Sequence, residues 1–303
     1  MGISLRELTG RLESARQSGV RALEFMLTES EGISLLVQRG KVVCQEPVTE
    51  ERLKVRCWVD GGGTGTAAGS VKRLDQLVAA ALVAAGKAPA NAFAAPVGRL
   101  DGSSGGLGID DRRYSRLTTA DKMDVVVAAE RSARSTDRRL ITGDFEYEDR
   151  RSRRVLINSK GAVWEEWDTI YHANGIVRSG AGDLKISSGV DGRTFAGVAS
   201  MPYGTVLGAR MSALLKKGPT ISGPIPVLLP PLATGRLVAR LGEEFHPRQL
   251  AEKKTFFSRS SDGPLVDKRL HLIDDGRLVG ALMTRGFDDR GVPAVPLTLL
   301  CEG

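Results

Sequence analysis

The sequence is poor in the residues that build most metal and redox sites. It has three histidines, and none lies three to five positions from another, which excludes a helical zinc motif of the HExxH type. Its three cysteines are widely spaced and form no CxxC pair, which favours reduced thiols in a cytoplasmic protein. A zinc site built by histidines from distant strands stays open, although isolated histidines are more often structural. These residues are His172, His246, His271, Cys44, Cys57 and Cys301.

Long apolar runs are missing as well. No run approaches the roughly 20 residues that a membrane-spanning helix needs. The N-terminal stretch also lacks the apolar segment of a secretory signal. We therefore expect a cytoplasmic protein without a membrane partner. The apolar content of 41% is that of a packed core, and 303 residues suffice for one large domain or two ordinary ones.

Catalytic and nucleotide-binding motifs are incomplete. The chain has no GxSxG nucleophile turn and no GxxxxGK[ST] loop. The glycine cluster DGGGTGTAAGS at residues 60–70 would need a glycine at position 68 to complete GxGxxG, and Ala68 stands there. A phosphate-binding loop and an ordinary strand-to-helix turn both stay open for this cluster. The paired carboxylates of IDDG and FDDRG favour turns over a cation site.

Positive charge is in excess, with a net charge of +7, and much of the excess lies in residues 131–154. One interpretation is a surface that follows the phosphates of a nucleic acid. The other is a solvated pair of strands in which neighbouring carboxylates offset the arginines. We favour the second, and do not expect nucleic acid as a partner, because no nucleic-acid recognition motif accompanies the arginines.

Apolar spacing predicts helices that begin near residues 5, 71, 118, 201 and 231, with Ser70 capping the second and a Thr118–Asp121 capping box opening the third. Short strands are predicted between residues 22 and 62, between 141 and 180, and after residue 265, with turns at QRGK, NSKG and HANG. Residues 86–117 are expected to form a surface connection.

This order of elements favours an α+β fold with mixed or antiparallel sheets and packed helices. We predict an N-terminal α/β region at residues 1–150 and a second α+β region at residues 151–303. An apolar strand is expected at residues 225–229, running directly into a helix, in the stretch IPVLLPPLATGRL.

Four stretches of the chain resemble the TldD/TldE (PmbA) family, the peptidase family formerly called modulators of DNA gyrase. Their order and spacing extend the resemblance over essentially the whole chain. The stretches are VLINSKG, GTVLGARMSALLKKGPTISGPIPVLLPP, PPLATGRLVARLGEEF and LHLIDDGRLVGALMTRGFDDRGVPAVPLTLLCEG.

The resemblance bears directly on metal binding. In the TldD branch, an apolar strand runs into a helix carrying His-Glu-x-x-x-His, whose histidines bind zinc and whose Glu activates metal-bound water. In this chain Pro230 and Pro231 stand at the positions of the first His and the Glu, and Gly235 stands at the second His. The chain therefore resembles the metal-free TldE branch, and we expect no cofactor in it.

The resemblance implies a non-catalytic subunit of a heterodimeric zinc metallopeptidase. Its partner would be a TldD-like subunit that holds the zinc. Its substrate would be an unstructured peptide, such as the leader peptide of a ribosomally made natural product. A stand-alone peptide- or protein-binding module without protease activity is the alternative. Because family members are usually longer, the resemblance also implies that the usual C-terminal extension is lacking.

Two family-like turns supply candidate contacts for a peptide or a partner. We expect Phe287 to be an apolar anchor in the core or in the subunit interface, with its neighbours shaping the turn beside it. The candidate residues are Asn158, Ser159 and Gly161 in the first turn, and Phe287, Asp288 and Gly291 in the second.

Overall fold

The computed structural model describes residues 3–14, 20–90, 96–98, 105–216, 218, 222–255 and 266–302. The chain divides into two compact units. The first unit comprises residues 1–216 and 276–294, and the second comprises residues 217–275 and 295–303. Residues 276–294 therefore belong to the first unit, although the chain on either side of them belongs to the second. They are here called the returning segment. The domain boundary predicted at residue 150 falls inside a strand of the first unit, because one hydrogen-bonded sheet continues through that position.

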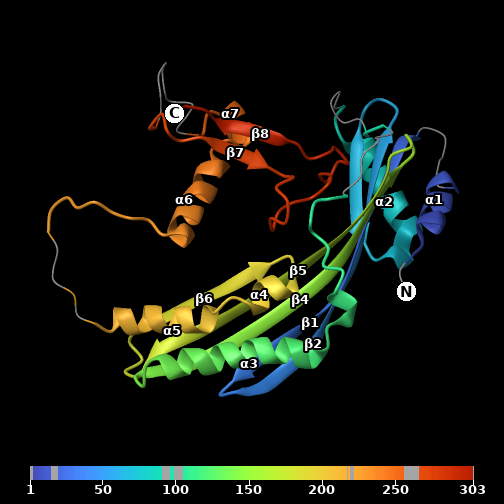
Figure 1. Cartoon of the computed structure of the whole chain (residues 1–303). Coiled ribbons are helices and arrows are strands. Elements are labelled where there is room, and N and C mark those ends of the chain that lie inside the picture. The colour runs from blue at the N-terminus through green and yellow to red at the C-terminus, as the bar shows by residue number, and fades with distance from the viewer. Residues whose placement is uncertain are drawn as a thin grey trace. The chain divides into compact units, whose positions relative to one another are not determined.

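The first unit is built on an antiparallel sheet with the strand order β3-β2-β1-β4-β5-β6, which confirms the predicted α+β class (Figure 1). Several of its strands are long, so the sheet carries a separate apolar core at each end of β1. The strands are β1 (Val20–Gln38), β2 (Lys41–Val59), β3 (Thr64–Gly69), β4 (Leu140–Asn158), β5 (Val163–Ser179) and β6 (Lys185–Gly192).

The helices of the first unit cover these two cores. One core packs α1 (Leu5–Ser14) and α2 (Leu74–Lys87) against the start of β1, and the other packs α3 (Thr119–Thr136) and α5 (Tyr203–Leu214) against its end. Helices α3 and α5 lie side by side (Figure 1) and approach closely, since a Cβ on Gly204 would lie 2.0 Å from the Ala129 carbonyl oxygen. Both predicted caps, at Ser70 and Thr118, are confirmed. The remaining short helices are α4 (Phe195–Ala199) and the 3-10 turns Val71–Arg73 and Tyr114–Arg116.

Several glycines that suggested turns lie inside strands instead. The HANG turn is wrong, because Gly175 lies within β5, where an added Cβ would stand 2.4 Å from the ring of Phe145. The short runs expected from residue 22 onward join into β1 and β2. Gly32 lies in the middle of β1, where an added Cβ would stand 1.9 Å from the Asp149 carbonyl oxygen. In the glycine cluster, Gly65 lies on β3 and permits close approach to α2. These glycines are explained by packing.

Part of the stretch at residues 86–117 packs into the core instead of forming a surface connection. Gly86 belongs to α2 rather than following it. Leu107, Ile109 and Tyr114 are all buried. The expectation of a purely peripheral segment is therefore wrong for the part that follows residue 105, because apolar side chains from it fill the space beside β5 and α3.

The second unit is small. It contains α6 (Pro231–Glu243), α7 (Pro247–Ala251), and an antiparallel pair of strands, β7 (Leu272–Asp275) and β8 (Pro296–Leu300). The strand predicted at residues 225–229 is wrong, since that stretch pairs with no described strand and precedes α6 as irregular chain. No described residue of α6 is buried. None of the helices in the described ranges is both long and apolar enough to cross a bilayer.

Candidate functional site

The first candidate turn, at residues 158–161, closes the hairpin between β4 and β5. Asn158 is buried, and its Oδ1 accepts hydrogen bonds from two backbone N–H groups of the turn at 2.9 and 3.2 Å. Ser159 holds the turn on β1, because its N–H donates to the Leu23 carbonyl (2.8 Å) and its Oγ accepts from the Leu23 N–H (3.0 Å). Gly161 has a φ of 89°, a conformation that favours glycine. The predicted NSKG turn is confirmed.

The second candidate turn, at residues 287–291, is built in a similar way. Oδ1 of Asp288 accepts from the N–H groups of Arg290 (2.7 Å) and Val292 (2.9 Å), as an acidic residue that opens a turn commonly does. Gly291 has a φ of 78°, and a Cβ there would lie 3.1 Å from the side chain of Leu156. The position therefore requires glycine for its backbone conformation and leaves little space for a side chain.

Phe287 anchors this second turn in the first unit. Its side chain is 0% exposed and packs with Leu156, Ala162 and Trp164. The ring stacks on that of Trp164, with centroids 5.2 Å apart, and the guanidinium carbon of Arg154 lies 5.2 Å from the ring centroid. The expectation of an apolar anchor is confirmed, and the anchor lies in the core of the first unit.

Glu24 and Arg56, which sequence reasoning missed, bring the two turns together. Glu24 lies opposite Asn158 in the register between β1 and β4. Nη1 of Arg56 donates to Oε1 of Glu24 (2.9 Å), and Nη2 donates to the carbonyl oxygen of Asp289 (3.3 Å). The one signal in the sequence is a carboxylate inside the apolar run ALEFML.

The carboxyl group of Glu24 is nearly removed from water, with 2% of the residue exposed. Burial raises the pKa of Glu24 to about 7, although the Arg56 guanidinium and the Asn158 side chain offset part of this shift. Its second oxygen, Oε2, has no hydrogen-bond partner among the described residues. The group therefore takes up a proton more readily in the folded protein than in the unfolded chain.

We expect the free energy of unfolding to decrease as the pH rises from about 4.5 to about 7, the unfolded and folded pKa values of Glu24. In this window the folded state holds a proton that the unfolded state has released. The stabilisation that this proton gives the folded state is therefore complete below the unfolded pKa of Glu24 and is lost as the pH rises through the folded pKa. One proton contributes at most about 1.4 kcal/mol per pH unit. Urea denaturation between pH 5 and 8 measures the slope.

The Glu24→Gln variant should lose this contribution to the slope, because an amide does not titrate. Glu148→Gln is the matched control, since Glu148 is exposed on β4 and should keep the wild-type slope. Equal slopes for wild type and Glu24→Gln would contradict the assignment of the proton to Glu24.

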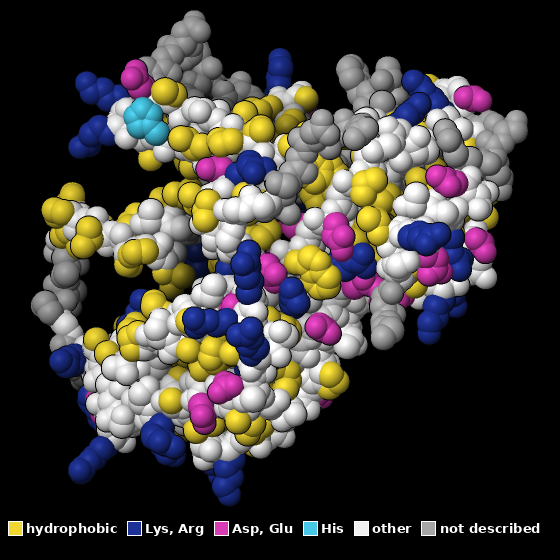
Figure 2. Space-filling model, turned by 45° about the vertical axis from the view of Figure 1, so that its right-hand side comes forward, with side chains coloured by type: hydrophobic (Ala, Val, Ile, Leu, Met, Phe, Trp, Pro, Cys, Tyr) yellow, Lys and Arg dark blue, Asp and Glu magenta, His cyan; other side chains and the backbone are white. Residues whose placement is uncertain are grey.

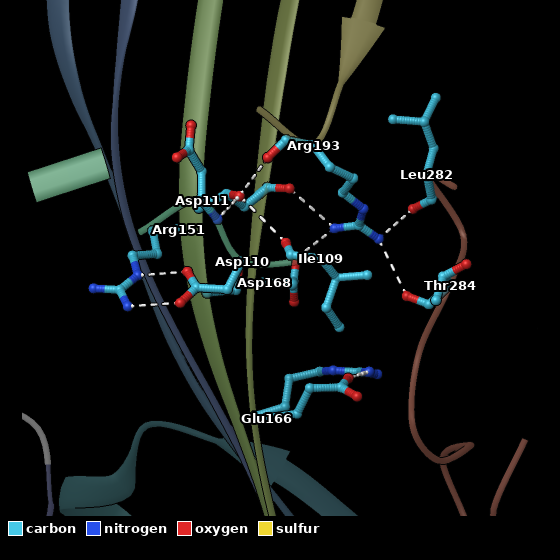
Figure 3. A network of polar contacts seen from close by, with 12 residues as sticks. Ile109, Asp110, Asp111, Arg151, Glu166, Asp168, Arg193, Leu282 and Thr284 are labelled. Atoms are coloured by element: carbon cyan, nitrogen blue, oxygen red, sulfur yellow. Dashed lines mark hydrogen bonds and ion pairs between the residues drawn. The ribbon is translucent and has the colours of Figure 1, made fainter. Parts of the chain in front are cut away.

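The buried side chain of Arg193 also binds the returning segment (Figure 3). Arg193 directly follows β6 and is 7% exposed. Its Nη1 donates to Oδ1 of Asp168 (2.9 Å) and to the carbonyl oxygen of Thr169 (3.1 Å). Its other nitrogens donate to backbone carbonyls of the returning segment. These acceptors belong to Ala281, Leu282 and Thr284.

Glu166 supplies a second buried contact to the same segment. It is 1% exposed, accepts a hydrogen bond from the N–H of Gly286, and forms an ion pair with Arg154. Because Arg154 also lies over the ring of Phe287, one carboxylate orients both the backbone and the side-chain anchor of the returning segment. No motif in the sequence marks Arg193 or Glu166.

The arginines of β4 are ion-paired with neighbouring carboxylates. Over the face drawn in Figure 2, acidic side chains likewise lie among the basic ones. Ion pairing of this kind leaves less positive potential for phosphates than the sequence alone indicates, which favours the strand-pair interpretation of residues 131–154. The pairs are Arg150–Glu50 (3.7 Å), Arg151–Asp110 (3.0 Å), Arg153–Glu29 (2.9 Å), Arg153–Glu165 (2.7 Å) and Arg154–Glu166.

The positions that correspond to the family's zinc motif open α6 in the second unit. Pro230 occupies the N-cap position without a side-chain capping hydrogen bond. Pro231 is the first helical residue, where a missing N–H costs no helical hydrogen bond. Gly235 follows one turn later. None of these three side chains offers a ligand atom. In the described part of the chain, no three His, Cys, Asp or Glu residues are grouped in a way that could hold a metal ion.

Comparison with known proteins gives matches to both sequence and fold. Residues 222–303 match the family model of the PmbA/TldA metallopeptidase C-terminal domain. A search of the curated proteins finds no match. Among solved structures, a protein named as a candidate modulator of DNA gyrase from Bacteroides thetaiotaomicron has a TM-score of 0.85 at 19% identity, covering 100% of this chain and 71% of that chain.

Two further solved structures are similar over nearly the whole chain. A candidate modulator of DNA gyrase from Thermotoga maritima has a TM-score of 0.82 at 19% identity, covering 99% of this chain and 69% of its own. TldE from Thermococcus kodakarensis has a TM-score of 0.78 at 14% identity, covering 98% of this chain and 68% of its own. The fold of the chain is therefore that of these proteins.

Proposed function

We propose that this chain is the non-catalytic, TldE-like subunit of a heterodimeric zinc metallopeptidase of the TldD/TldE (PmbA) type. The match of residues 222–303 to the PmbA/TldA metallopeptidase C-terminal domain and the fold shared with TldE support the proposal. The observation that carries the proposal is the start of α6. A domain of metallopeptidase type retains this helix but places Pro230, Pro231 and Gly235 where a catalytic relative would carry its zinc ligands and general base. The chemistry would then come from a TldD-like partner.

The proposed substrate is an unstructured peptide, including leader peptides of ribosomally made natural products. An extended peptide can add to the edge of a sheet as a further strand. The peptide backbone then forms hydrogen bonds with the sheet that depend little on the peptide's sequence. Loose specificity for unfolded chains follows from such binding. We propose that the exposed rims of the two candidate turns, around Lys160 and Arg290, contact the peptide or the partner.

We expect peptide cleavage only when this chain is combined with a TldD-like subunit that carries His-Glu-x-x-x-His. The two chains should elute together in size-exclusion chromatography, and the complex should contain zinc while this chain alone contains no stoichiometric zinc. Elemental analysis and cleavage of an unfolded peptide measure both properties. A chain that binds peptide but neither joins the partner nor supports cleavage would favour the stand-alone binding module.

The histidines of this chain provide the matched controls. His172→Ala, His246→Ala and His271→Ala should each leave the zinc content of the complex unchanged, because this chain supplies no ligand. One tightly held zinc in the isolated chain, lost in any of these variants, would overturn the non-catalytic assignment.

A further inference from the structure

Strand β6 forms one edge of the sheet beside α5, and no described strand pairs with its outer side (Figure 1). The N–H of Ser179 donates to the carbonyl of Leu184 at 3.0 Å, so hydrogen-bonded pairs between β5 and β6 recur at every second residue from there. Ile186 and Ser188 therefore bond to β5, whereas Ser187 directs its N–H and C=O outward. A row of free backbone groups of this kind is a template for another extended chain.

An apolar pocket of about 480 Å³ opens beside this edge, between β6 and α5. Its volume suits one or more aliphatic side chains. Leu214 remains 55% exposed, although it belongs to a helix that otherwise packs on the sheet. The apolar lining comes from Ile186, Leu207, Ala213 and Leu214, and the polar lining includes Ser188 and Arg210.

Unpaired positive charge lies on both faces of this edge of the sheet. On the face turned away from α5, Arg178 of β5 lies directly opposite Lys185 of β6, an arrangement in which like charges repel. The guanidinium of Arg210 contacts Ser188 Oγ at 3.3 Å. Within the described ranges, none of these three cations has a carboxylate at ion-pair distance. Acidic side chains on the two faces of an added strand would complement Arg210 on the α5 face and relieve the repulsion between Arg178 and Lys185 on the other.

We propose that the free edge of β6 binds an acidic, extended peptide as an additional strand. An aliphatic side chain of the peptide occupies the pocket, a carboxylate pairs with Arg210, and the peptide backbone bonds to the outward groups of Ser187 and alternate residues. Side chains of an added strand alternate between the two faces, so every second one points toward α5. The inference rests on the proposed function, which supplies the class of ligand, an unstructured peptide. It adds where on this chain the peptide binds and which charge the peptide carries.

Fluorescence anisotropy with a labelled ten-residue peptide of Glu, Thr and one central Leu tests the site on the isolated full chain. A Glu two residues from the Leu lies on the same face of the strand and can reach Arg210. We expect saturable binding that Arg210→Glu weakens about tenfold, because a charge-assisted hydrogen bond is lost. Lys41→Glu changes the net charge equally at an exposed position on β2 and should change the affinity less than about twofold. A peptide with Lys in place of Glu should bind at least about tenfold more weakly.

The backbone part of the proposal is tested separately. Ser187→Pro removes an outward N–H without removing a bond to β5, so it should weaken binding about tenfold while Ser187→Ala does not. A peptide N-methylated at alternate residues should show the same loss on the wild-type chain, which keeps the test valid if Ser187→Pro fails to fold. Absence of binding by wild type, or binding insensitive to Arg210→Glu and to N-methylation, would overturn the proposal.

These measurements need neither a partner nor cleavage. A failed titration therefore counts against the β6 site while the test of complex formation stands. A chain that binds the peptide but joins no zinc subunit would count against the heterodimer while the β6 site stands.

Discussion

Replacing Phe287 with alanine is expected to lower the free energy of unfolding by roughly 3–5 kcal/mol, the usual cost of deleting a buried aromatic ring. The ring is 0% exposed and stacks on Trp164, so its removal leaves a cavity against an aromatic neighbour. Because the ring lies in the core of the first unit, the loss should appear as reduced stability of the isolated chain. Urea denaturation followed by tryptophan fluorescence measures it, with Trp164 reporting from the contact itself.

Met283→Ala is the matched control, because Met283 lies in the same returning segment and is 84% exposed. Its unfolding free energy should change by less than about 0.5 kcal/mol. If Phe287→Ala and Met283→Ala unfolded at the same urea concentration as wild type, the anchoring role of Phe287 would be wrong.

Replacing Arg193 with alanine is expected to be equally costly, roughly 3–5 kcal/mol, because the change removes a buried cation and leaves the partly buried Asp168 carboxylate without its partner. It also removes the donors to three backbone carbonyls of the returning segment. Hydrogen exchange should therefore accelerate most at residues 276–294. Mass spectrometry of exchanged peptides, together with urea denaturation, measures the local and the global effect.

Two variants make the result specific to the guanidinium. Arg193→Lys keeps the charge but not the forked donors, so its stability should fall between those of wild type and the alanine variant. Arg131→Ala removes an exposed arginine from α3 and should have little effect. Unchanged exchange at residues 276–294 in Arg193→Ala would show that another contact holds the segment.

Local signals predicted the parts of the fold that depend on local chemistry. The capping box of Thr118 with Asp121 and the cap of Ser70 are hydrogen bonds between residues close in sequence, so the residue types alone indicate them. The turns at residues 158–161 and 287–291 were predictable for the same reason. The proline pair likewise marks the start of α6 correctly.

Glycines show why other parts could not be predicted. Gly161 has a positive φ and makes a turn, whereas Gly175 lies in mid-strand because the ring of Phe145 fills the space of its missing side chain. Both look alike in the sequence, because the second role depends on a neighbouring strand. Likewise, the contacts of Glu24, Arg56 and Arg193 depend on strand register and on the returning segment. These contacts join residues far apart in the chain, so no short stretch of sequence indicates them.

The return of residues 276–294 to the first unit has a consequence for biosynthesis. A ribosome delivers the chain from its N-terminus, so the sheet strands emerge well before the segment that Arg193 and Glu166 bind. Until residue 294 has left the ribosome, the nascent first unit carries a cation and a carboxylate without their final backbone partners, and an open space where Phe287 belongs. Completion of this unit therefore has to wait until all of its sheet strands have been made, and a nascent chain stalled before residue 294 would present an unfinished core to the cell's quality-control machinery.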